Sequence, residues 1–349
     1  MKKIAVGISG GVDSAVSALL LKQQGYEVIG INLLLYKKPD EIESSKDLKD
    51  AQAICDKIGI DFFVKDLRDE FMGEIIDNFV GEYQNGRTPN PCIMCNEKMK
   101  FGKLLDYATE LGCDYLATGH YAKIEEKDGH FYLKRTDNPK DQSYFLYRLK
   151  EEKLARIKFP LFNMEKPQIR EIAKQNNLPV ALKSDSQDIC FVKDGDYISF
   201  IEKYANQKAI KGSFVDEKGE YLGEHKGIYC YTVGQRRGLG IALGERCFVS
   251  KIDANENKVY LSTANSKKPK KFLIENVTFI NIQKLEGTMD VTAKTRYRQK
   301  PENATITAHG NDIILEYHDY ESFVSPGQSA VFYIDDTVIG GGLVKSILN

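Results

Sequence analysis

No run of apolar residues in this 349-residue sequence is long enough to span a lipid bilayer, which argues against a membrane-embedded helical protein. The first apolar segment is soon interrupted by Gly7, so we expect no signal peptide and a cytoplasmic location. The formal net charge of −1 excludes a uniformly basic chain, so a nucleic-acid site would have to be a local basic patch. Internal repeats and low-complexity tracts are also lacking. What remains is a globular chain long enough for two or three domains.

The most informative segment is a glycine- and serine-rich octapeptide near the N-terminus. Its residues, Gly7, Ile8, Ser9, Gly10, Gly11, Val12, Asp13 and Ser14, follow the apolar run 3–6 and precede a helical pattern that ends at Gly25. A strand, a glycine loop and a helix N-terminus together form an anion site, because glycine permits close approach and the first helical N–H groups favour negative charge. The loop lacks the lysine of the kinase-type phosphate loop. The sequence Ser-Gly-Gly-Val-Asp-Ser instead resembles the PP-loop of ATP pyrophosphatases.

The first half of the chain alternates strand and helix patterns. We expect strands over residues 26–32, 60–64 and 115–118, and helices over 47–58 and 68–83. Such alternation predicts an α/β domain with a parallel sheet, whose ligands bind beyond the carboxyl ends of the strands. A hairpin is expected over residues 121–136, followed by helices over 141–149, 165–176 and 195–204.

From about residue 208 the pattern changes to short alternating runs separated by Gly, Asn and Asp. We expect strands over residues 229–233, 247–252, 258–262, 291–297, 304–308, 313–317 and 330–334. This spacing predicts one or two small all-β, barrel-like domains, with the segment 266–271 as a linker. The predicted organisation is therefore a Rossmann-like domain over 1–205, a central β domain over 206–270 and a C-terminal β-barrel over 271–349.

Two of the seven cysteines stand in a Cys-x-x-Cys pair and a third follows a polar stretch. Cys92 and Cys95 follow two prolines, and we expect a helix to begin near Lys98, which would stabilise the Cys95 thiolate. Cys190 ends the polar segment 184–189. The other four cysteines are expected to be structural: Cys55 on an apolar helix face, Cys230 and Cys247 within strands, and Cys113 just before a strand.

Three interpretations of these cysteines remain open. Cys95 and Cys190 could form a catalytic pair in which one carries a persulfide and the other resolves it as a disulfide. Alternatively, Cys92, Cys95 and Cys190 could ligate an iron–sulfur cluster with one open iron. A structural zinc site would need Cys113 or His120 to complete its ligands, because no second Cys-x-x-Cys exists.

Two basic segments occur in the β-rich half. Lys294, Arg296, Arg298 and Lys300 alternate, which on a strand would place all four on one face. A glycine-framed loop around Arg236 and Arg237 adds guanidinium groups suited to phosphate. Together they predict RNA binding, although a solvated strand face would give the same pattern.

The ordered set of motifs resembles one family closely. Pro-Asn-Pro-Cys-x-x-Cys-Asn, Ala-Thr-Gly-His-Tyr, Lys-Asp-Gln-Ser-Tyr-Phe-Leu, Ile-Cys-Phe, Gly-Gln-Arg-Arg-Gly-Leu-Gly, Thr-Arg-Tyr-Arg and Pro-Gly-Gln-Ser-Ala-Val-Phe follow the PP-loop in that order. From Gly7 to Leu343 the chain is similar to the bacterial tRNA-specific 2-thiouridylases, which are tRNA-uridine 2-sulfurtransferases.

The resemblance implies a role for individual residues. The octapeptide 7–14 would bind ATP phosphates, with Leu33 and Gly119 beside the adenosine. Cys95 would be the nucleophile and Cys190 the persulfide carrier. Contacts to the tRNA substrate would come from Asn90, Pro91, Cys92, His120, Lys140, Asp141, Gln142, Arg296, Tyr297 and Gln328. One departure is Cys92, where many members have aspartate, and this extra thiol keeps the cluster interpretation open.

The implied reaction is ATP-dependent 2-thiolation of the wobble uridine of tRNA for lysine, glutamate and glutamine. Mg²⁺ is expected, with Asp13 as a candidate ligand, and a cysteine desulfurase or sulfur-carrier protein would supply the sulfur to a monomeric enzyme. We expect the segment 181–194 to be a mobile loop, since Cys190 must reach both donor and uridine. The rival hypotheses are a PP-loop amide ligase acting on a small metabolite and a non-catalytic iron–sulfur or zinc protein that binds tRNA.

Overall fold

The computed structural model describes residues 1–36, 46–181, 183, 189–241, 246–263, 266 and 268–348. These residues form two compact units. The first unit comprises Met1–Ile75, Cys92–Gln187 and Asp336–Ile339, and the second comprises Ile76–Pro91, Asp188–Asp335 and Gly340–Asn349. Among the described residues, no helix is both long and apolar enough to cross a membrane.

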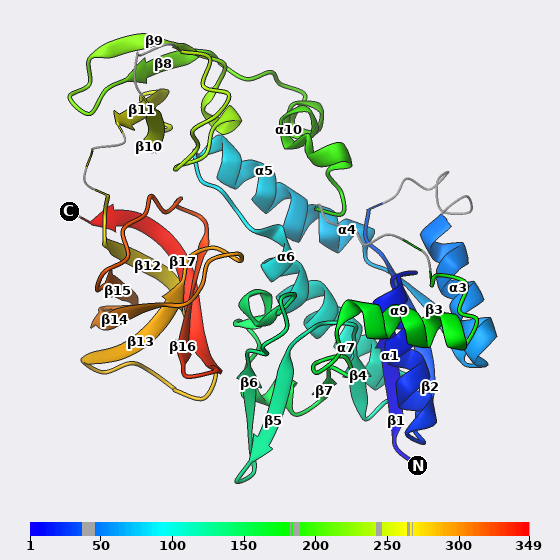
Figure 1. Cartoon of the computed structure of the whole chain (residues 1–349). Helices are drawn as coiled ribbons and strands as arrows, with labels where there is room; N and C mark the ends of the chain where they lie inside the picture. The colour runs from blue at the N-terminus through cyan, green and yellow to red at the C-terminus, as the bar shows by residue number, and fades with distance from the viewer. Residues whose placement is uncertain are drawn as a thin grey trace. The chain divides into compact units, whose positions relative to one another are not determined.

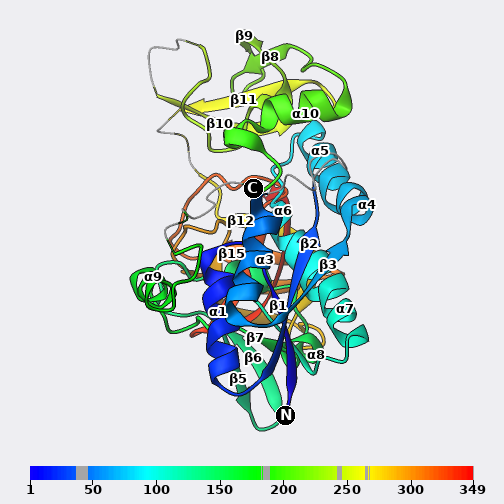
Figure 2. The same ribbon diagram turned by 90° about the vertical axis from the view of Figure 1, so that its right-hand side faces the viewer.

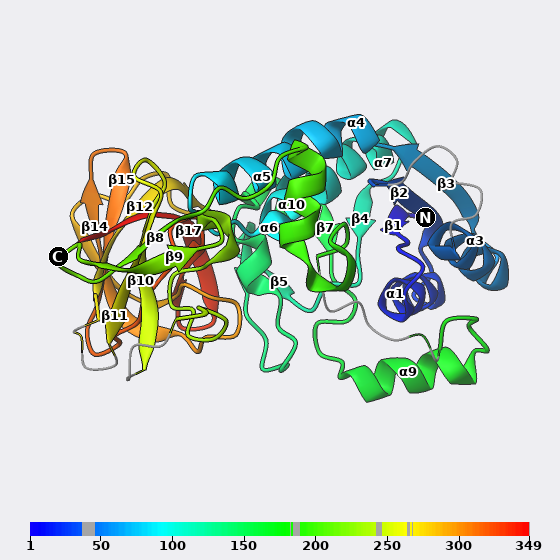
Figure 3. The same ribbon diagram turned by 90° about the horizontal axis from the view of Figure 1, so that it is seen from above.

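The first unit is built on a parallel sheet in the order β3-β2-β1-β4-β7 (Figure 1). Its strands are β1 (Lys3–Gly7), β2 (Glu27–Leu34), β3 (Asp61–Asp66), β4 (Tyr115–Ala117) and β7 (Ile157–Lys158). Ile4, Ala5 and Val6 of the central strand are completely buried, because helices cover both faces of the sheet. Figure 3 shows α1 (Val12–Gln23) and α9 (Lys166–Gln175) on one side of the sheet, with α4 (Arg68–Phe71) and α7 (Leu104–Glu110) on the other. The predicted Rossmann-like α/β domain is confirmed.

Several elements of this unit lie where the sequence predicted them. Helix α3 (Lys46–Ile58) buries Ile54 and Cys55. Helix α4 continues through a π-helical turn, η1 (Met72–Ile76), into α5 (Asp77–Gln84), which already belongs to the second unit. The predicted hairpin consists of β5 (Lys123–Lys127) and β6 (His130–Lys134). Asp128 and Gly129 at its turn both have positive φ, as a two-residue hairpin turn requires.

Two helix predictions in this part of the chain were wrong. Residues 141–149 form only a short 3₁₀ turn, η3 (Ser143–Leu146), before α8 (Glu151–Leu154). The helix expected from Lys98 begins earlier, as α6 (Pro91–Met94), and continues through a π-helix, η2 (Cys95–Lys103), into α7. Proline fits the first helical position because its missing N–H would be unpaired there in any case.

The second unit contains two β structures, as predicted. A four-stranded sheet has the order β10-β11-β8-β9, formed by β8 (Gly212–Val215), β9 (Tyr221–His225), β10 (Cys247–Asp253) and β11 (Lys258–Thr263). Six further strands form a closed barrel, because β12 pairs with both β15 and β17. They are β12 (Lys271–Phe279), β13 (Thr288–Lys294), β14 (Glu302–His309), β15 (Asp312–Tyr317), β16 (Ser329–Ile334) and β17 (Thr337–Leu348). The short helices are η4 (Lys193–Gly195), α10 (Tyr197–Ala205) and η5 (Ile228–Cys230).

The strand predicted over residues 229–233 does not form. Residues Ile228–Cys230 make a 3₁₀ turn, and Gly227 before it has a φ of 141°. Tyr231 and Val233, two of the alternating residues that suggested a strand, instead contribute to the core of the four-stranded sheet. Burial by an irregular segment therefore produced the same pattern as a strand.

Candidate active site

The octapeptide loop joins the central strand to α1 at the carboxyl edge of the parallel sheet. Gly10 has a φ of 75°, and a Cβ atom there would lie 2.6 Å from the carbonyl oxygen of Asp47, so this position requires glycine. Gly11 precedes α1 and no side chain caps the helix. The first N–H groups of α1 and its positive dipole end are therefore available to an anion.

Hydrogen bonds fix the shape of this loop. The Ser14 hydroxyl donates to the Gly11 carbonyl at 3.0 Å and accepts from the Ser9 N–H at 3.3 Å. The buried Asn32 side chain donates to the Ile8 carbonyl at 2.6 Å. The loop is thus held in one conformation before any ligand binds.

Parallel pairing brings the predicted nucleotide residues to one edge. Gly7 ends β1 opposite Ile31 of β2, and Leu33 lies two residues further along β2. Gly119 lies two residues beyond the end of β4, which pairs with the other side of β1. A Cβ atom at Gly119 would lie 2.8 Å from the Asp13 Cβ atom, so this glycine permits direct contact between the β4 end and α1.

Asp13, in the first turn of α1, is the acidic group of this edge. Lys166 at the start of α9 donates to both of its carboxylate oxygens, at 2.8 and 2.9 Å. The Tyr121 hydroxyl donates to the same carboxylate at 2.8 Å. Neither partner was predicted, because 153 residues separate Asp13 from Lys166 and no local motif marks the lysine.

A second unpredicted lysine braces the loop from the other side. Lys183 donates to the Gly10 carbonyl at 2.9 Å and to the carboxylates of Asp47 and Asp50 at 2.9 and 2.7 Å. Burial alone would lower the pKa of Lys183, but hydrogen bonds to Asp50 and Asp47 raise it above its ordinary value. Lys183 therefore stays protonated and ties the loop to α3.

His120, Asp141 and Gln142 lie close to Gly119 but are engaged within the protein. His120 is 8% exposed, shares a 2.8 Å hydrogen bond with the Thr118 hydroxyl, and has a pKa well below its ordinary range because of burial and the nearby Lys100. Asp141 accepts from the Ser143 hydroxyl at 2.7 Å, and Gln142 accepts from the Tyr121 N–H at 3.0 Å.

Lys140 is the exposed member of this group. Whether any member of the group touches RNA stays a prediction.

Cys92 and Cys95 lie inside the helical segment that begins at Pro91, and not before a helix N-terminus as predicted. Cys92 is exposed, whereas Cys95, the first residue of the π-helix η2, is buried with 8% of its surface exposed. Helices of this wide type are often found at functional sites. Desolvation by the surrounding protein raises the pKa of the Cys92 thiol, while Lys100 acts in the opposite direction.

Cys190 is exposed and belongs to the second unit, whereas Cys95 belongs to the first. Within the predicted mobile loop, residues 182 and 184–188 lie outside the described part of the chain, so its mobility and the meeting of the two thiols stay predictions.

The structural zinc interpretation finds no support in the described ranges. There, no three His, Cys, Asp or Glu side chains cluster as metal ligands do. Cys113 precedes β4 whereas His120 follows it, so these two candidate ligands lie at opposite edges of the sheet. The expected structural role of Cys113 agrees with its 4% exposure.

Gln328 of the barrel contacts the start of the segment that leads to the cysteine pair. Its side-chain amide donates to the Thr88 carbonyl at 2.7 Å, and the Ser325 hydroxyl donates to the Thr88 hydroxyl at 2.8 Å. The Thr88 N–H in turn donates to the Pro326 carbonyl at 2.8 Å. Asn90 and Pro91 follow two and three residues later, so the barrel fixes the approach to this loop.

The prediction that Lys294, Arg296, Arg298 and Lys300 lie along one strand is wrong. Strand β13 ends at Lys294, and residues 295–299 form bends and a turn rather than a continuation of the strand. Lys294 is 6% exposed, with its ammonium 5.7 Å from the centroid of the Tyr297 ring, whereas Arg298 is exposed. Arg296 donates to the Phe323 carbonyl. The basic side chains therefore do not share one strand face.

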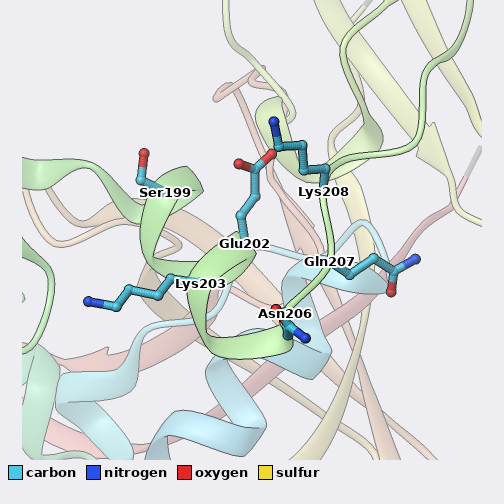
Figure 4. A pocket seen from close by; sticks show the side chains of 6 residues that line it. All are labelled: Ser199, Glu202, Lys203, Asn206, Gln207 and Lys208. Carbon is cyan, nitrogen blue, oxygen red and sulfur yellow. The ribbon is translucent and has the colours of Figure 1, made fainter.

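An open hollow of about 330 Å³ lies at the end of α10 (Figure 4). It is lined by Ser199, Glu202, Lys203, Asn206, Gln207 and Lys208. These side chains are mostly long and flexible, and none of them belongs to a predicted site, so the hollow gives no indication of a ligand.

Comparisons with known proteins give a consistent result. The profile described as tRNA methyl transferase HUP domain matches residues 2–194, that of the tRNA methyl transferase PRC-barrel domain matches 198–263, and that of the Aminomethyltransferase beta-barrel domain matches 269–344. The tRNA-specific 2-thiouridylase MnmA of Clostridium perfringens is 45% identical over 356 residues, which cover 99% of both chains. The protein of the same description from Clostridioides difficile is 44% identical over 357 residues, again covering 99% of both.

Among solved structures, a 4-thiouridine synthetase–RNA complex with bound ATP is similar over 58% of this chain and 50% of that chain, at 17% identity and a TM-score of 0.37. This likeness is too weak to support an inference.

Proposed function

Because this chain belongs to the family of tRNA-specific 2-thiouridylases, we propose that it transfers sulfur to C2 of the wobble uridine of tRNA at the expense of ATP. The observation that carries the proposal is the uncapped N-terminus of α1 behind a glycine loop, in a chain 45% identical to a 2-thiouridylase over its whole length. Such an anion site suits a nucleoside triphosphate.

ATP binds at the carboxyl edge of the parallel sheet in this proposal. The loop from Gly7 to Ser14 holds the phosphates, and Leu33 and Gly119 border the adenosine. The uridine is turned out of its base stack, as enzymes that modify a base require. Its C2 oxygen attacks the α-phosphorus, the bond to the β-phosphate oxygen breaks, and pyrophosphate leaves with the electron pair. The C2 oxygen then departs later as part of AMP.

The residues of the loop also fit the expected Mg²⁺. Carboxylate oxygen is a ligand that Mg²⁺ favours, and the Asp13 carboxylate, which Lys166 and Tyr121 contact in this structure, would be the group at the loop to hold the ion. The ion, when bound, supplies positive charge against the phosphates.

In this proposal sulfur transfer uses Cys95 and Cys190, with a persulfide on Cys190. In one route the Cys95 thiolate attacks the Sγ of Cys190 and releases hydrosulfide, which displaces AMP from C2. In the other route the terminal persulfide sulfur attacks C2 and displaces AMP. The Cys95 thiolate then attacks the Sγ of Cys190 and breaks the S–S bond, whose electron pair stays on the sulfur at C2 as the thiocarbonyl. Both routes leave a Cys95–Cys190 disulfide, which a dithiol reductant returns to two thiols by supplying two electrons.

A variant of this chemistry retains the iron–sulfur cluster, with Cys92, Cys95 and Cys190 as ligands and an open iron that activates sulfur. Metal analysis of anaerobically purified protein separates the two forms. About four irons per wild-type chain, together with loss of that iron from Cys92→Ala, would favour the cluster. An iron-free active enzyme would favour the persulfide.

The proposed tRNA contacts lie in both units. They are Asn90, Pro91, Cys92, His120, Lys140, Asp141, Gln142, Arg296, Tyr297 and Gln328. We further propose tRNA for lysine, glutamate and glutamine as substrates and a cysteine desulfurase or sulfur carrier as donor. The enzyme would act as a cytoplasmic monomer with domains over 1–205, 206–270 and 271–349.

The test is a reconstituted reaction containing tRNA transcript, ATP, a persulfide donor and a dithiol. We expect AMP, pyrophosphate and 2-thiouridine in equal amounts with wild type. Cys95→Ser and Cys190→Ser should form no 2-thiouridine but keep tRNA affinity, and the buried Cys55→Ser serves as the thiol control. Thiolation that survives in both active-site variants, or transfer of a methyl group to the tRNA, would contradict the proposal.

The two rival functions predict different outcomes. A PP-loop amide ligase would consume ATP with a small metabolite and would not depend on Cys95 or Cys190. A non-catalytic metalloprotein would bind tRNA without forming AMP.

A further inference from the structure

The phosphate loop lacks the lysine that a kinase-type loop carries, yet a cation from elsewhere in the chain lies against it. The Lys166 ammonium donates to Asp13 at 2.8 and 2.9 Å, and Asp13 is the second residue of α1. The cation therefore lies close to the helix end that the loop presents to an anion. Figure 2 shows α9, which carries Lys166, nearly end-on and next to α1.

The backbone of Lys166 is fixed by its helix. Glu165 and Gln168 form a reciprocal capping box at the start of α9, where Lys166 is the first helical residue. Ile169 and Ala173 of the same helix are completely buried in the core that α1 shares. The ammonium is thus delivered by a rigid element, which is how a charge-stabilising group is preorganised.

The stability that the Lys166–Asp13 ion pair contributes is too small to explain why Lys166 lies at this position. Its side chains are 13% and 30% exposed for Lys166 and Asp13, and isolated pairs that solvent reaches contribute little to stability. The neighbouring Lys183 serves a different purpose. Its ammonium has three donors, and three acceptors already take them: the Gly10 carbonyl and the carboxylates of Asp47 and Asp50.

We propose that Lys166 is the cation of the phosphate site. Asp13 holds the ammonium in place until ATP arrives, and Lys166 then donates N–H bonds to the β- and γ-phosphate oxygens. As the bond between the α-phosphorus and the bridging oxygen breaks, the electron pair stays on pyrophosphate, and Lys166 stabilises that charge without forming a covalent bond. This proposal rests on the proposed use of ATP and adds a residue to it.

The test compares Lys166→Gln with Lys166→Arg and with Lys174→Gln, which removes the same charge from an exposed position of the same helix. Affinity for MgATP is measured by calorimetry without tRNA, beside kcat and KM for AMP formation and the melting temperature. We expect Lys166→Gln to weaken ATP binding about 10-fold, as loss of one charged hydrogen bond does. It should lower kcat by about 100-fold, as loss of one charge-stabilising donor does.

The two controls separate charge from structure. Lys174→Gln should behave as wild type, and Lys166→Arg should keep most of the ATP affinity because it keeps the charge. Wild-type ATP affinity and wild-type kcat in a folded Lys166→Gln variant would overturn the proposal. An equal loss of ATP affinity in Lys166→Arg and in Lys166→Gln, with unchanged melting temperatures, would also overturn it.

The outcomes also separate this proposal from the function on which it rests. A wild-type chain that thiolates tRNA while Lys166→Gln binds ATP normally would refute only the role of Lys166. A chain that transfers no sulfur, but binds ATP in a manner that depends on Lys166, would refute only the thiolation.

Discussion

Replacing Gly119 by alanine tests the contact between the end of β4 and the first turn of α1. The added Cβ atom would lie 2.8 Å from the Asp13 Cβ atom, 2.9 Å from the Asp13 carbonyl carbon and 3.0 Å from the Ser14 nitrogen. The φ of Gly119 is not in the left-handed region, so alanine can adopt the backbone conformation and the penalty is steric. Two of the three atoms belong to the backbone of α1, which can give way only if the helix moves.

The magnitude follows from overpacking. An extra carbon forced into a packed site costs about 1–3 kcal/mol. At about 2–4 °C per kcal/mol for a domain of this size, the melting temperature should fall by roughly 2–12 °C. Because Asp13 moves with the helix, affinity for MgATP should fall as well.

The assay is thermal unfolding followed by ATP calorimetry, with Gly73→Ala as the matched control. Gly73 is exposed in a helical segment, and a Cβ atom there meets nothing within 4 Å. Alanine at that position should leave stability unchanged or raise it by about 0.4–1 kcal/mol. A Gly119→Ala protein that melts and binds ATP like wild type would refute the close contact.

Three other perturbations test the burial of His120, the contact of Gln328 with Thr88 and the binding of tRNA by the barrel. The pKa of His120 is lowered by burial, so below about pH 6.5 the unfolded chain takes up a proton that the folded chain does not. The free energy of unfolding, measured by urea titration, should therefore fall between pH 7 and pH 5, and should fall less in His120→Gln. An equal fall in the two proteins would contradict this. Gln328→Leu removes the donor to a loop carbonyl and should cost about 1 kcal/mol in the same titration, with an unchanged midpoint as the contrary result. Arg298→Glu should weaken tRNA binding and reduce the slope of log affinity against log salt by about 1, whereas an unchanged slope would place the RNA elsewhere.

The parts of the fold that the sequence predicted depend on local signals. The strand–loop–helix unit around Gly10 combines an apolar strand, glycines and a helical period, all within 25 residues. At the hairpin, the pair Asp128–Gly129 is a strong local signal for a two-residue turn, because both residues tolerate positive φ. Parallel pairing then placed Leu33 and Gly119 at one edge with the loop, as the rule for open α/β sheets requires.

The errors arise where one pattern has two physical causes. Alternation over 294–300 was interpreted as a strand, but Lys294 is buried beside the Tyr297 ring and a turn follows it. The start of the helix before Cys92 was missed because Pro91 was taken as part of a loop, although proline is also favoured at the first helical position. The Asp13–Lys166 pair lay beyond any local signal, because only the packing of α9 on α1 brings the two together.

Nucleoside mass spectrometry can show whether this chain thiolates tRNA in the cell, using tRNA from cells whose copy of this gene is deleted and complemented by wild type or by Cys190→Ser. We expect 2-thiouridine derivatives to disappear on deletion and to return with wild type but not with Cys190→Ser. Derivatives that persist without the gene, or that return with the cysteine variant, would contradict this expectation.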